Sequence, residues 1–304
     1  MTATNEFTNR RRSLKRLKEQ LIEWLLSASA FISILTATAI VIILVVESAG
    51  FFRQVSLLEF LTGAQWAPLF KPQHFGVLPL VTGTLLTSAI ACMVAIPFGL
   101  LSAIYLSQYA KQAVRAVIKP LLEVLVGIPT VVFGYFALTM VTPFLKNFFP
   151  QIRVFNALSA GMVMGIMIIP IVSSLSEDAM TAVPGHLREG ALALGATRLE
   201  ATLKVIIPAS LSGIIASFVL AISRAIGETM IVALAAGLTP NLTLNPLESV
   251  QTMTAYIVQV SLGDTPFGSI EYRTVFAVAL LLFLFTLVLN ILGKALVGWK
   301  QKIY

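Results

Sequence analysis

The sequence predicts an all-α, polytopic integral membrane protein with about six transmembrane helices. Of its 304 residues, 57% are hydrophobic and only 12% are charged, whereas a soluble domain has about 25% charged residues. The mean hydropathy is +0.90, and the apolar residues gather in long runs of the kind that a spanning helix needs, roughly 20 residues each. Six such runs cover residues 24–46, 78–106, 120–145, 157–175, 209–237 and 274–297.

The distribution of Lys and Arg predicts how these helices are oriented. Residues 1–22 form a basic tail with six of them, and residues 23–304 are expected to form the transmembrane domain. Counted along the chain, with Lys294 at the end of the last run included in the C-terminal segment, the odd-numbered segments carry 15 Lys and Arg residues and the even-numbered segments carry 5. Because cytoplasmic loops are enriched in these residues, we expect the tail and both chain termini in the cytoplasm. The same enrichment accounts for the net charge of +7.

The stretch between the fourth and fifth runs, residues 177–208, has the pattern of two short helices joined by a turn. Pro184 suits the first turn of a helix, and apolar residues at positions 187, 191 and 194 fall on one face of it. Gly195 is placed to end this helix in a left-handed conformation.

The second short helix is indicated by a capping box. Thr197 is followed three residues later by Glu200, so that each side chain can bond to the backbone N–H of the other residue. Pro208 is expected to stop this helix. Two short helices can also indicate DNA binding, but this stretch carries three basic and four acidic residues and has no basic face. We therefore expect no nucleic-acid partner.

A spaced motif in this stretch resembles a known one. It consists of Glu189-Gly190-Ala191, Gly195 and Val205-Ile206-Ile207-Pro208. It is similar to the EAA loop of ATP-binding-cassette (ABC) importer permeases, which reads E-A-A, three residues, G, nine residues, I-x-L-P. The three departures, Gly190, Val205 and Ile207, are small or apolar. The resemblance implies that Glu189, Gly190, Ala191, Gly195 and Pro208 couple the chain to a separate ATPase that binds the ATP.

A second block of residues narrows the resemblance to one group of ABC importers. Residues 223–230, S-R-A-I-G-E-T-M, are similar to the fifth-helix signature of the permeases of bacterial phosphate-specific importers, and residues 66–68, 75–88 and 127–134 extend the match. Together they resemble the C-type phosphate permease more than its A-type partner, over about residues 60–300. This implies a type I ABC importer permease in the bacterial cytoplasmic (inner) membrane. Its implied partners are a homologous A-type permease, two copies of an ABC ATPase and an external phosphate-binding protein.

Arg224 lies near the middle of the fifth run, where a charged side chain costs about 2.5–3.5 kcal/mol on insertion scales. Glu228 follows at i+4 and is expected on the same helix face. Arginine can hold a tetrahedral oxyanion through two parallel hydrogen bonds, and the carboxylate can balance its charge or accept the proton of hydrogen phosphate. We therefore assign Arg224, Glu228 and the adjacent Thr229 to the substrate pathway. A purely structural ion pair is the alternative.

Two other kinds of transporter are alternatives to a phosphate permease, whereas the sequence has no motif for a metal site or for ATP binding. A permease for molybdate or sulfate would keep the EAA loop, whereas an ion-coupled secondary transporter working through Glu228 would have no use for it. The two histidines, His74 and His186, are expected on opposite sides of the membrane and form no metal site. Gly293-Lys294 does not complete a phosphate-binding loop. We expect a transport subunit without a cofactor of its own, not an enzyme.

Overall fold

In the computed structural model, the backbone is described for residues 3–301 and the side chains for residues 19–295, 297 and 298. Within these limits the regular secondary structure is helical apart from one two-stranded ribbon, which confirms the predicted all-α class. Five helical stretches are long and apolar enough to span a membrane, and a sixth crossing results if one sharply bent pair of helices is counted as a single span. The predicted number of about six spans is confirmed, although the third is not a straight helix.

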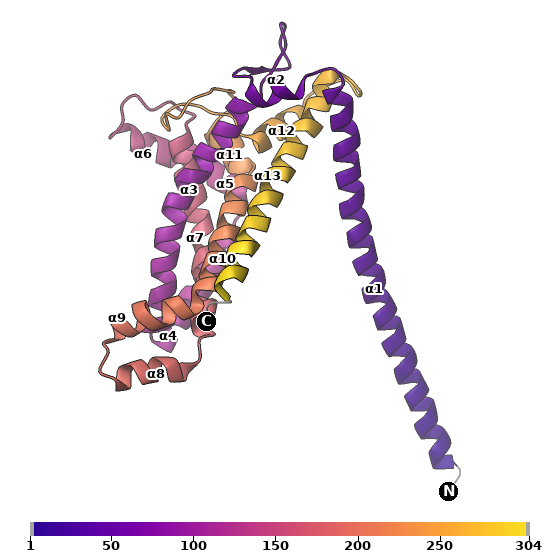
Figure 1. Cartoon of the computed structure of the whole chain (residues 1–304), viewed down its shortest axis with the longest axis vertical. Coiled ribbons are helices and arrows are strands. Elements are labelled where there is room, and N and C mark those ends of the chain that lie inside the picture. Colours follow the sequence, from indigo (N-terminus) through magenta and orange to yellow (C-terminus); the bar gives the residue numbers. More distant parts are fainter. Residues whose placement is uncertain (1–2, 302–304) are drawn as a thin grey trace.

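The first helix is long and largely isolated. α1, Ala3–Phe52, stands apart from the other helices along most of its length (Figure 1). It joins them near its C-terminal end, where Glu47 pairs with Arg273 of α13, Ile270–Gln301, at 3.8 Å. The most apolar part of α1 contains no buried residue. The basic residues of the expected tail lie at positions up to 18, outside the described side chains.

A short helix and the β-ribbon follow at the end of the molecule where α1 finishes. α2, Leu57–Thr62, leads into β1, Trp66–Ala67, which pairs antiparallel with β2, His74–Phe75, in a hairpin that projects from this end (Figure 1). The Trp66 ring packs edge-on against Tyr256, with 4.9 Å between the ring centroids. Such aromatic contacts fix the base of the hairpin to the helices beneath it.

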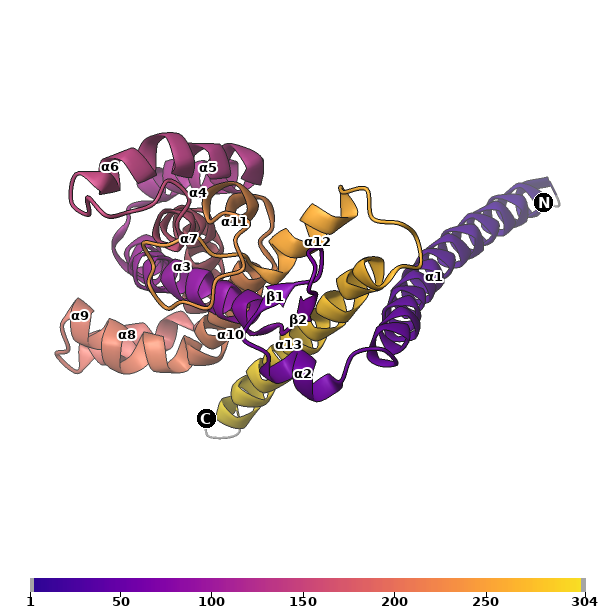
Figure 2. The same ribbon diagram turned by 90° about the horizontal axis from the view of Figure 1, so that it is seen from above.

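The centre of the bundle is a closely packed pair of helices. α3, Leu78–Ile104, continues into the π turn η1, Tyr105–Tyr109, and lies beside α7, Ala157–Thr181. A Cβ atom placed on Gly161 or Gly165 of α7 would lie 2.7 Å from a side-chain atom of α3. Only glycine permits this approach of the two backbones. The pair forms the centre around which α4–α6 and α13 lie on opposite sides (Figure 2).

The third run forms a bent element. α4, Gln112–Gly127, is followed by α5, Thr130–Phe136, the π turn η2, Ala137–Val141, and α6, Thr142–Lys146. The two halves meet at 88°, so the single helix expected over this run is wrong. Pro129 has no N–H to continue α4, and it holds the residue before it in an extended conformation (φ −69°, ψ 129°).

The EAA loop leads into the fifth run without a break. α8, Gly185–Ala193, is followed by α9, Arg198–Ala201, the π turn η3, Thr202–Ile206, and α10, Ile207–Gly227. The expectation that Pro208 stops the second loop helix is wrong, because Arg198–Gly227 is one continuous helical stretch. The π turn just before the proline bonds across five residues instead of four, and this wider turn accommodates a residue that lacks an N–H.

The fifth run is broken near its far end. α10 ends at Gly227, two residues are not helical, and α11, Met230–Ala235, begins. The single span expected over residues 209–237 is therefore wrong. α12, Met253–Ser261, and α13 complete the chain. The start of α1, the end of α13 and the loop helices α8 and α9 all lie at one end of the molecule (Figure 1).

Candidate functional site

The first helix of the EAA loop ends in a hydrogen-bonded turn that depends on glycine. The N–H of Ala196 donates to the carbonyl of Ala191 at 3.1 Å, and the N–H of Gly195 donates to the carbonyl of Leu192 at 3.0 Å. Both bonds form because Gly195 adopts φ +87°, a left-handed conformation that side chains disfavour. The predicted glycine cap is confirmed.

The second loop helix begins with the predicted capping box. The N–H of Glu200 donates to Thr197 Oγ1 at 3.2 Å, and the N–H of Thr197 donates to Glu200 Oε2 at 3.0 Å. The two caps hold α8 and α9 in a fixed relation. The outer surface of α8 is not covered by other parts of this chain. Glu189 and Gly190 are exposed, and Leu194, just after α8, is 91% exposed.

Glu228 has a different position from the one expected. It follows the end of α10 and is extended (φ −67°, ψ 138°), so it does not share a helix face with Arg224. Its carboxylate accepts hydrogen bonds from the N–H groups of Met230 at 3.2 Å and Ile231 at 3.5 Å. Only 6% of the residue is exposed. Glu228 therefore caps the start of α11, and the expected geometry of an i, i+4 pair is wrong because the helix stops at Gly227.

Arg224 lies on the exposed side of α10. The ion pairs among the described residues do not include it. Thr229, at the break, donates from its hydroxyl to the carbonyl of Gly227 at 3.2 Å. The structure thus brings Arg224, Glu228 and Thr229 to the broken end of one span, but the carboxylate bonds to the start of α11 and not to the arginine.

A cavity of about 430 Å³ lies one helical turn from Arg224, toward the EAA loop. Its lining includes Leu220 of α10, Pro170 of α7, and Lys119 and Glu123 of α4. Residues of α4, α7 and α10 line it together with Leu106 of η1, so helices on both sides of the EAA loop contribute to its wall. The lining is mostly apolar and includes the charged groups Lys119, Glu123 and Glu177.

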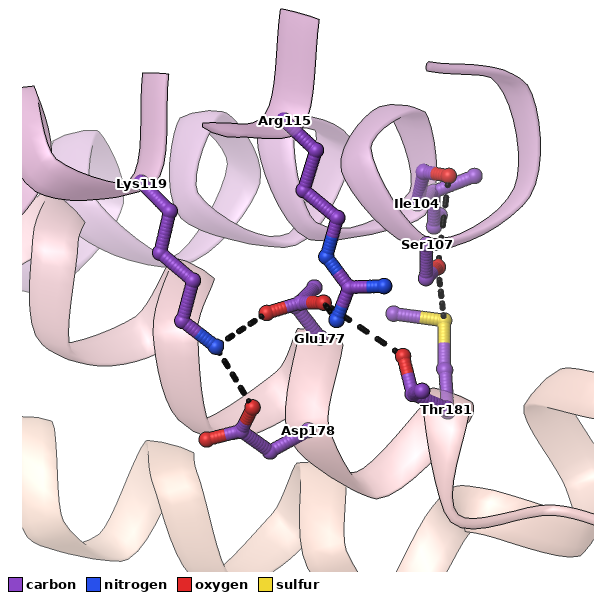
Figure 3. A network of polar contacts seen from close by, with 8 residues as sticks. Ile104, Ser107, Arg115, Lys119, Glu177, Asp178 and Thr181 are labelled. Atoms are coloured by element: carbon purple, nitrogen blue, oxygen red, sulfur yellow. Dashed lines mark hydrogen bonds and ion pairs between the residues drawn. The ribbon is translucent and has the colours of Figure 1, made fainter. Parts of the chain in front are cut away.

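Glu177 was placed in the soluble part of the loop by its sequence, yet it is buried in α7. Its side chain is 1% exposed and forms ion pairs with Arg115 and Lys119 of α4, the latter at 2.9 Å (Figure 3). Lys119 also contacts Asp178 at 2.8 Å. We call these four residues the α4–α7 charge cluster. The i, i+4 spacing of Arg115 and Lys119 indicated a shared helix face, but no local signal identified the carboxylate opposite.

Comparisons with known proteins agree with this architecture. The family described as binding-protein-dependent transport system inner membrane component matches residues 95–301. The chain is 35% identical to the Probable ABC transporter permease protein YqgH of Bacillus subtilis over 93% of both chains. It is 31% identical to the Phosphate transport system permease protein PstC of Mesorhizobium japonicum, over 78% of this chain and 77% of that one.

A solved structure has the same fold. It is a bacterial ABC transporter involved in the import of the acidic polysaccharide alginate, with a TM-score of 0.64, 16% identity, and coverage of 93% of this chain and 98% of that chain. At this identity the likeness concerns the fold alone.

Proposed function

The chain belongs to the inner-membrane components of binding-protein-dependent transport systems, and from this premise we propose that it is the C-type permease of an ATP-driven phosphate importer. It is a multi-pass ABC importer permease, a transport subunit and not an enzyme. Phosphate as the substrate is supported by its PstC relatives. The observation that carries the proposal is Arg224, an exposed arginine next to a break in a spanning helix.

The break itself favours a pathway. Non-helical backbone at membrane depth occurs only where it is buried in protein or lines a water-filled cavity, and an arginine facing lipid is costly. The exposed side of α10 therefore faces the translocation pathway, shared with a second permease. There the planar guanidinium of Arg224 can bind an oxyanion with two parallel hydrogen bonds, with Thr229 close to it in the chain.

The role of Glu228 changes the argument for phosphate over other oxyanions. Oε1 of its carboxylate accepts two backbone N–H groups, so the start of α11, and not Arg224, fixes the orientation of this carboxylate. This capping contact holds the backbone at the break beside Arg224, and it would do so equally for any tetrahedral oxyanion. The preference for phosphate over sulfate or molybdate thus depends on the relatives and on the external binding protein.

Coupling to ATP hydrolysis is assigned to the EAA loop. Glu189, Gly190 and Ala191 lie on α8, whose end is fixed by the Gly195 turn, and Pro208 follows in the helix that leads to Arg224. The exposed Leu194 supplies apolar surface for a docking partner. We assign as partners an A-type permease, two copies of an ABC ATPase that binds the ATP, and an external phosphate-binding protein.

The proposed function is tested with the complete complex in lipid vesicles. ATP hydrolysis is expected to rise when phosphate and the binding protein are both present, and phosphate is expected to accumulate on the opposite side. Sulfate and molybdate at the same concentrations are the controls. An equal rise with sulfate would contradict the assignment to phosphate, and no response to any oxyanion would contradict the importer.

The proposed location is the bacterial cytoplasmic membrane, with both termini in the cytoplasm, and a labelling experiment tests it. After Cys92→Ala removes the native thiol, Ser56→Cys and Thr239→Cys are expected to react with an impermeant thiol reagent added to intact cells. Both positions are exposed. Leu194→Cys, exposed on the EAA loop, is expected to react only after the cells are opened and the docked ATPase is removed from the membrane. Labelling of Leu194→Cys in intact cells would reverse the orientation.

A further inference from the structure

The α4–α7 charge cluster ties two helices that are not neighbours in the sequence (Figure 3). Glu177 is almost completely buried, while the side chains of Arg115 and Lys119 are 33% and 28% exposed. A buried carboxylate is stable in its charged form only while its cations accompany it, and removing one partner is strongly destabilising. α4 therefore cannot separate from α7 at this level without leaving the charge of Glu177 unpaired.

Glu177 also lies next to the start of the EAA loop. α7 ends four residues later at Thr181, whose hydroxyl donates to Glu177 Oε1 at 3.4 Å. Only three residues then separate α7 from Gly185, where α8 begins. A displacement of α8 by a docked partner consequently acts on the end of α7 that carries the cluster.

α4 connects the cluster to the region of Arg224 by packing. Beyond the bend, α5 lies against α11: a Cβ atom on Gly134 would lie 3.0 Å from Leu234 Cδ1 and 3.2 Å from the Cα atom of Ile231. The N–H of Ile231 is one of the two that Glu228 accepts. The other end of the EAA loop reaches Arg224 through the continuous helix from α9.

We propose that Glu177 is a positioning residue that makes α4 follow α7 when the ATPase moves the EAA loop. This inference rests on the proposed function. With Glu177 in place, both ends of the loop act on the walls of the cavity next to Arg224, one through α10 and the other through α7 and α4. Without the carboxylate, α10 still follows the movement of the EAA loop, but α4 does not. Each cycle of ATP hydrolysis then no longer opens the pathway.

The variant Glu177→Gln tests the proposal in the reconstituted complex. Glutamine keeps the shape of the side chain but not its charge, and Lys119 retains Asp178 as a partner. The number of phosphate ions transported per ATP hydrolysed is expected to fall roughly 2- to 30-fold, the range seen for residues that carry coupling between sites. ATPase binding and ATP hydrolysis should remain. A purely structural role would lower the amount of complex without changing this ratio.

Asp178→Asn is the matched control. It removes a carboxylate from the same lysine, but at a side chain that is 56% exposed, where ion pairs contribute little. The ratio of phosphate to ATP should stay at the wild-type value in this variant. A wild-type ratio in Glu177→Gln, at equal amounts of complex, overturns the proposal.

A distance measurement separates this inference from the proposed function. With Cys92→Ala as background, spin labels at Gln112→Cys on α4 and Ala182→Cys after α7 report whether the two helix ends move together. The distance between the labels should stay constant when a non-hydrolysable ATP analogue binds the ATPase, and should change or broaden in Glu177→Gln. No phosphate is needed, so a complex that fails to transport phosphate still tests the proposal. A constant distance in both proteins overturns it.

A second variant covers the case in which Glu177→Gln does not accumulate. Glu177→Leu combined with Arg115→Met and Lys119→Met removes all the buried charge while filling the same volume, a replacement that is often neutral or stabilising. The distance between the labels should again change on binding the ATP analogue. If it stays constant, packing alone holds α4 to α7 and Glu177 has no positioning role.

Discussion

Arg224→Gln is expected to abolish phosphate uptake while the complex still assembles and its ATPase still binds. The side chain is exposed on α10 and has no ion-pair partner among the described residues, so its removal leaves no buried carboxylate unpaired. What is lost is the group that would meet the anion at membrane depth. Uptake of labelled phosphate at matched membrane abundance measures the effect.

Two further variants define the chemistry of this position. Arg224→Lys keeps the charge but lacks the planar fork that binds an oxyanion with two parallel bonds, so uptake should be strongly reduced. Arg153→Gln is the control, because it removes an arginine that is exposed in the segment between α6 and α7, outside the spanning helices. Near wild-type uptake in Arg224→Gln would remove this residue from the substrate pathway.

Gly195→Val is expected to uncouple the permease from its ATPase. A left-handed conformation costs an ordinary residue roughly 1–2 kcal/mol, and a β-branched side chain at φ +87° is strained further. Valine should therefore open the turn after α8, which the bonds to Ala191 and Leu192 now close, and misplace the surface that docks. Co-purification of the ATPase and phosphate uptake should both fall severely.

Gly190→Ala provides the matched comparison in the same helix. No atom lies within 4 Å of the position that a Cβ would take at Gly190, and replacing a mid-helix glycine by alanine stabilises a helix by about 1 kcal/mol. Because the EAA motif itself has alanine at this position of the coupling surface, this variant should bind the ATPase and transport as well as the wild type. Normal ATPase binding and uptake in Gly195→Val would mean that the EAA loop does not have its assigned role.

Features that depend on a few neighbouring residues could be predicted from the sequence. The Gly195 turn and the capping box of Thr197 and Glu200 each need groups no more than five residues apart, and both are formed. The apolar runs similarly identified the spans, because span length is fixed by the thickness of the bilayer.

The effects of proline were not predictable in the same way. Pro129 lies in the break at an 88° bend, whereas Pro97 and Pro170 lie inside continuous helices. Pro208 follows a π turn that continues as helix. Each proline removes one backbone donor. Whether the helix then breaks depends on neighbouring helices and on the local turn, and the sequence around the proline does not contain this information.

Only part of the candidate site could be predicted from the sequence, again because contacts with other segments decide the rest. The motif at residues 223–230 identified Arg224 and Glu228, but the end of α10 at Gly227 changed their relation from a pair to two separate roles. Glu177 was missed because its partners lie 58 and 62 positions away in the sequence, and nothing in the local pattern specifies a contact over such a distance.

The π turn η3 sets the angle about the helix axis between the EAA loop and Arg224. It inserts one residue into an otherwise continuous helix from α9 to α10, and each residue of an α-helix advances the direction of the side chains by about 100°. Because packing against α7 and α13 fixes the buried face of α10, a helix without this insertion would turn α9 and the EAA loop by about 100° relative to Arg224. The single extra residue thus lets the loop surface proposed to dock the ATPase lie on one side of this helix while Arg224 lies on another.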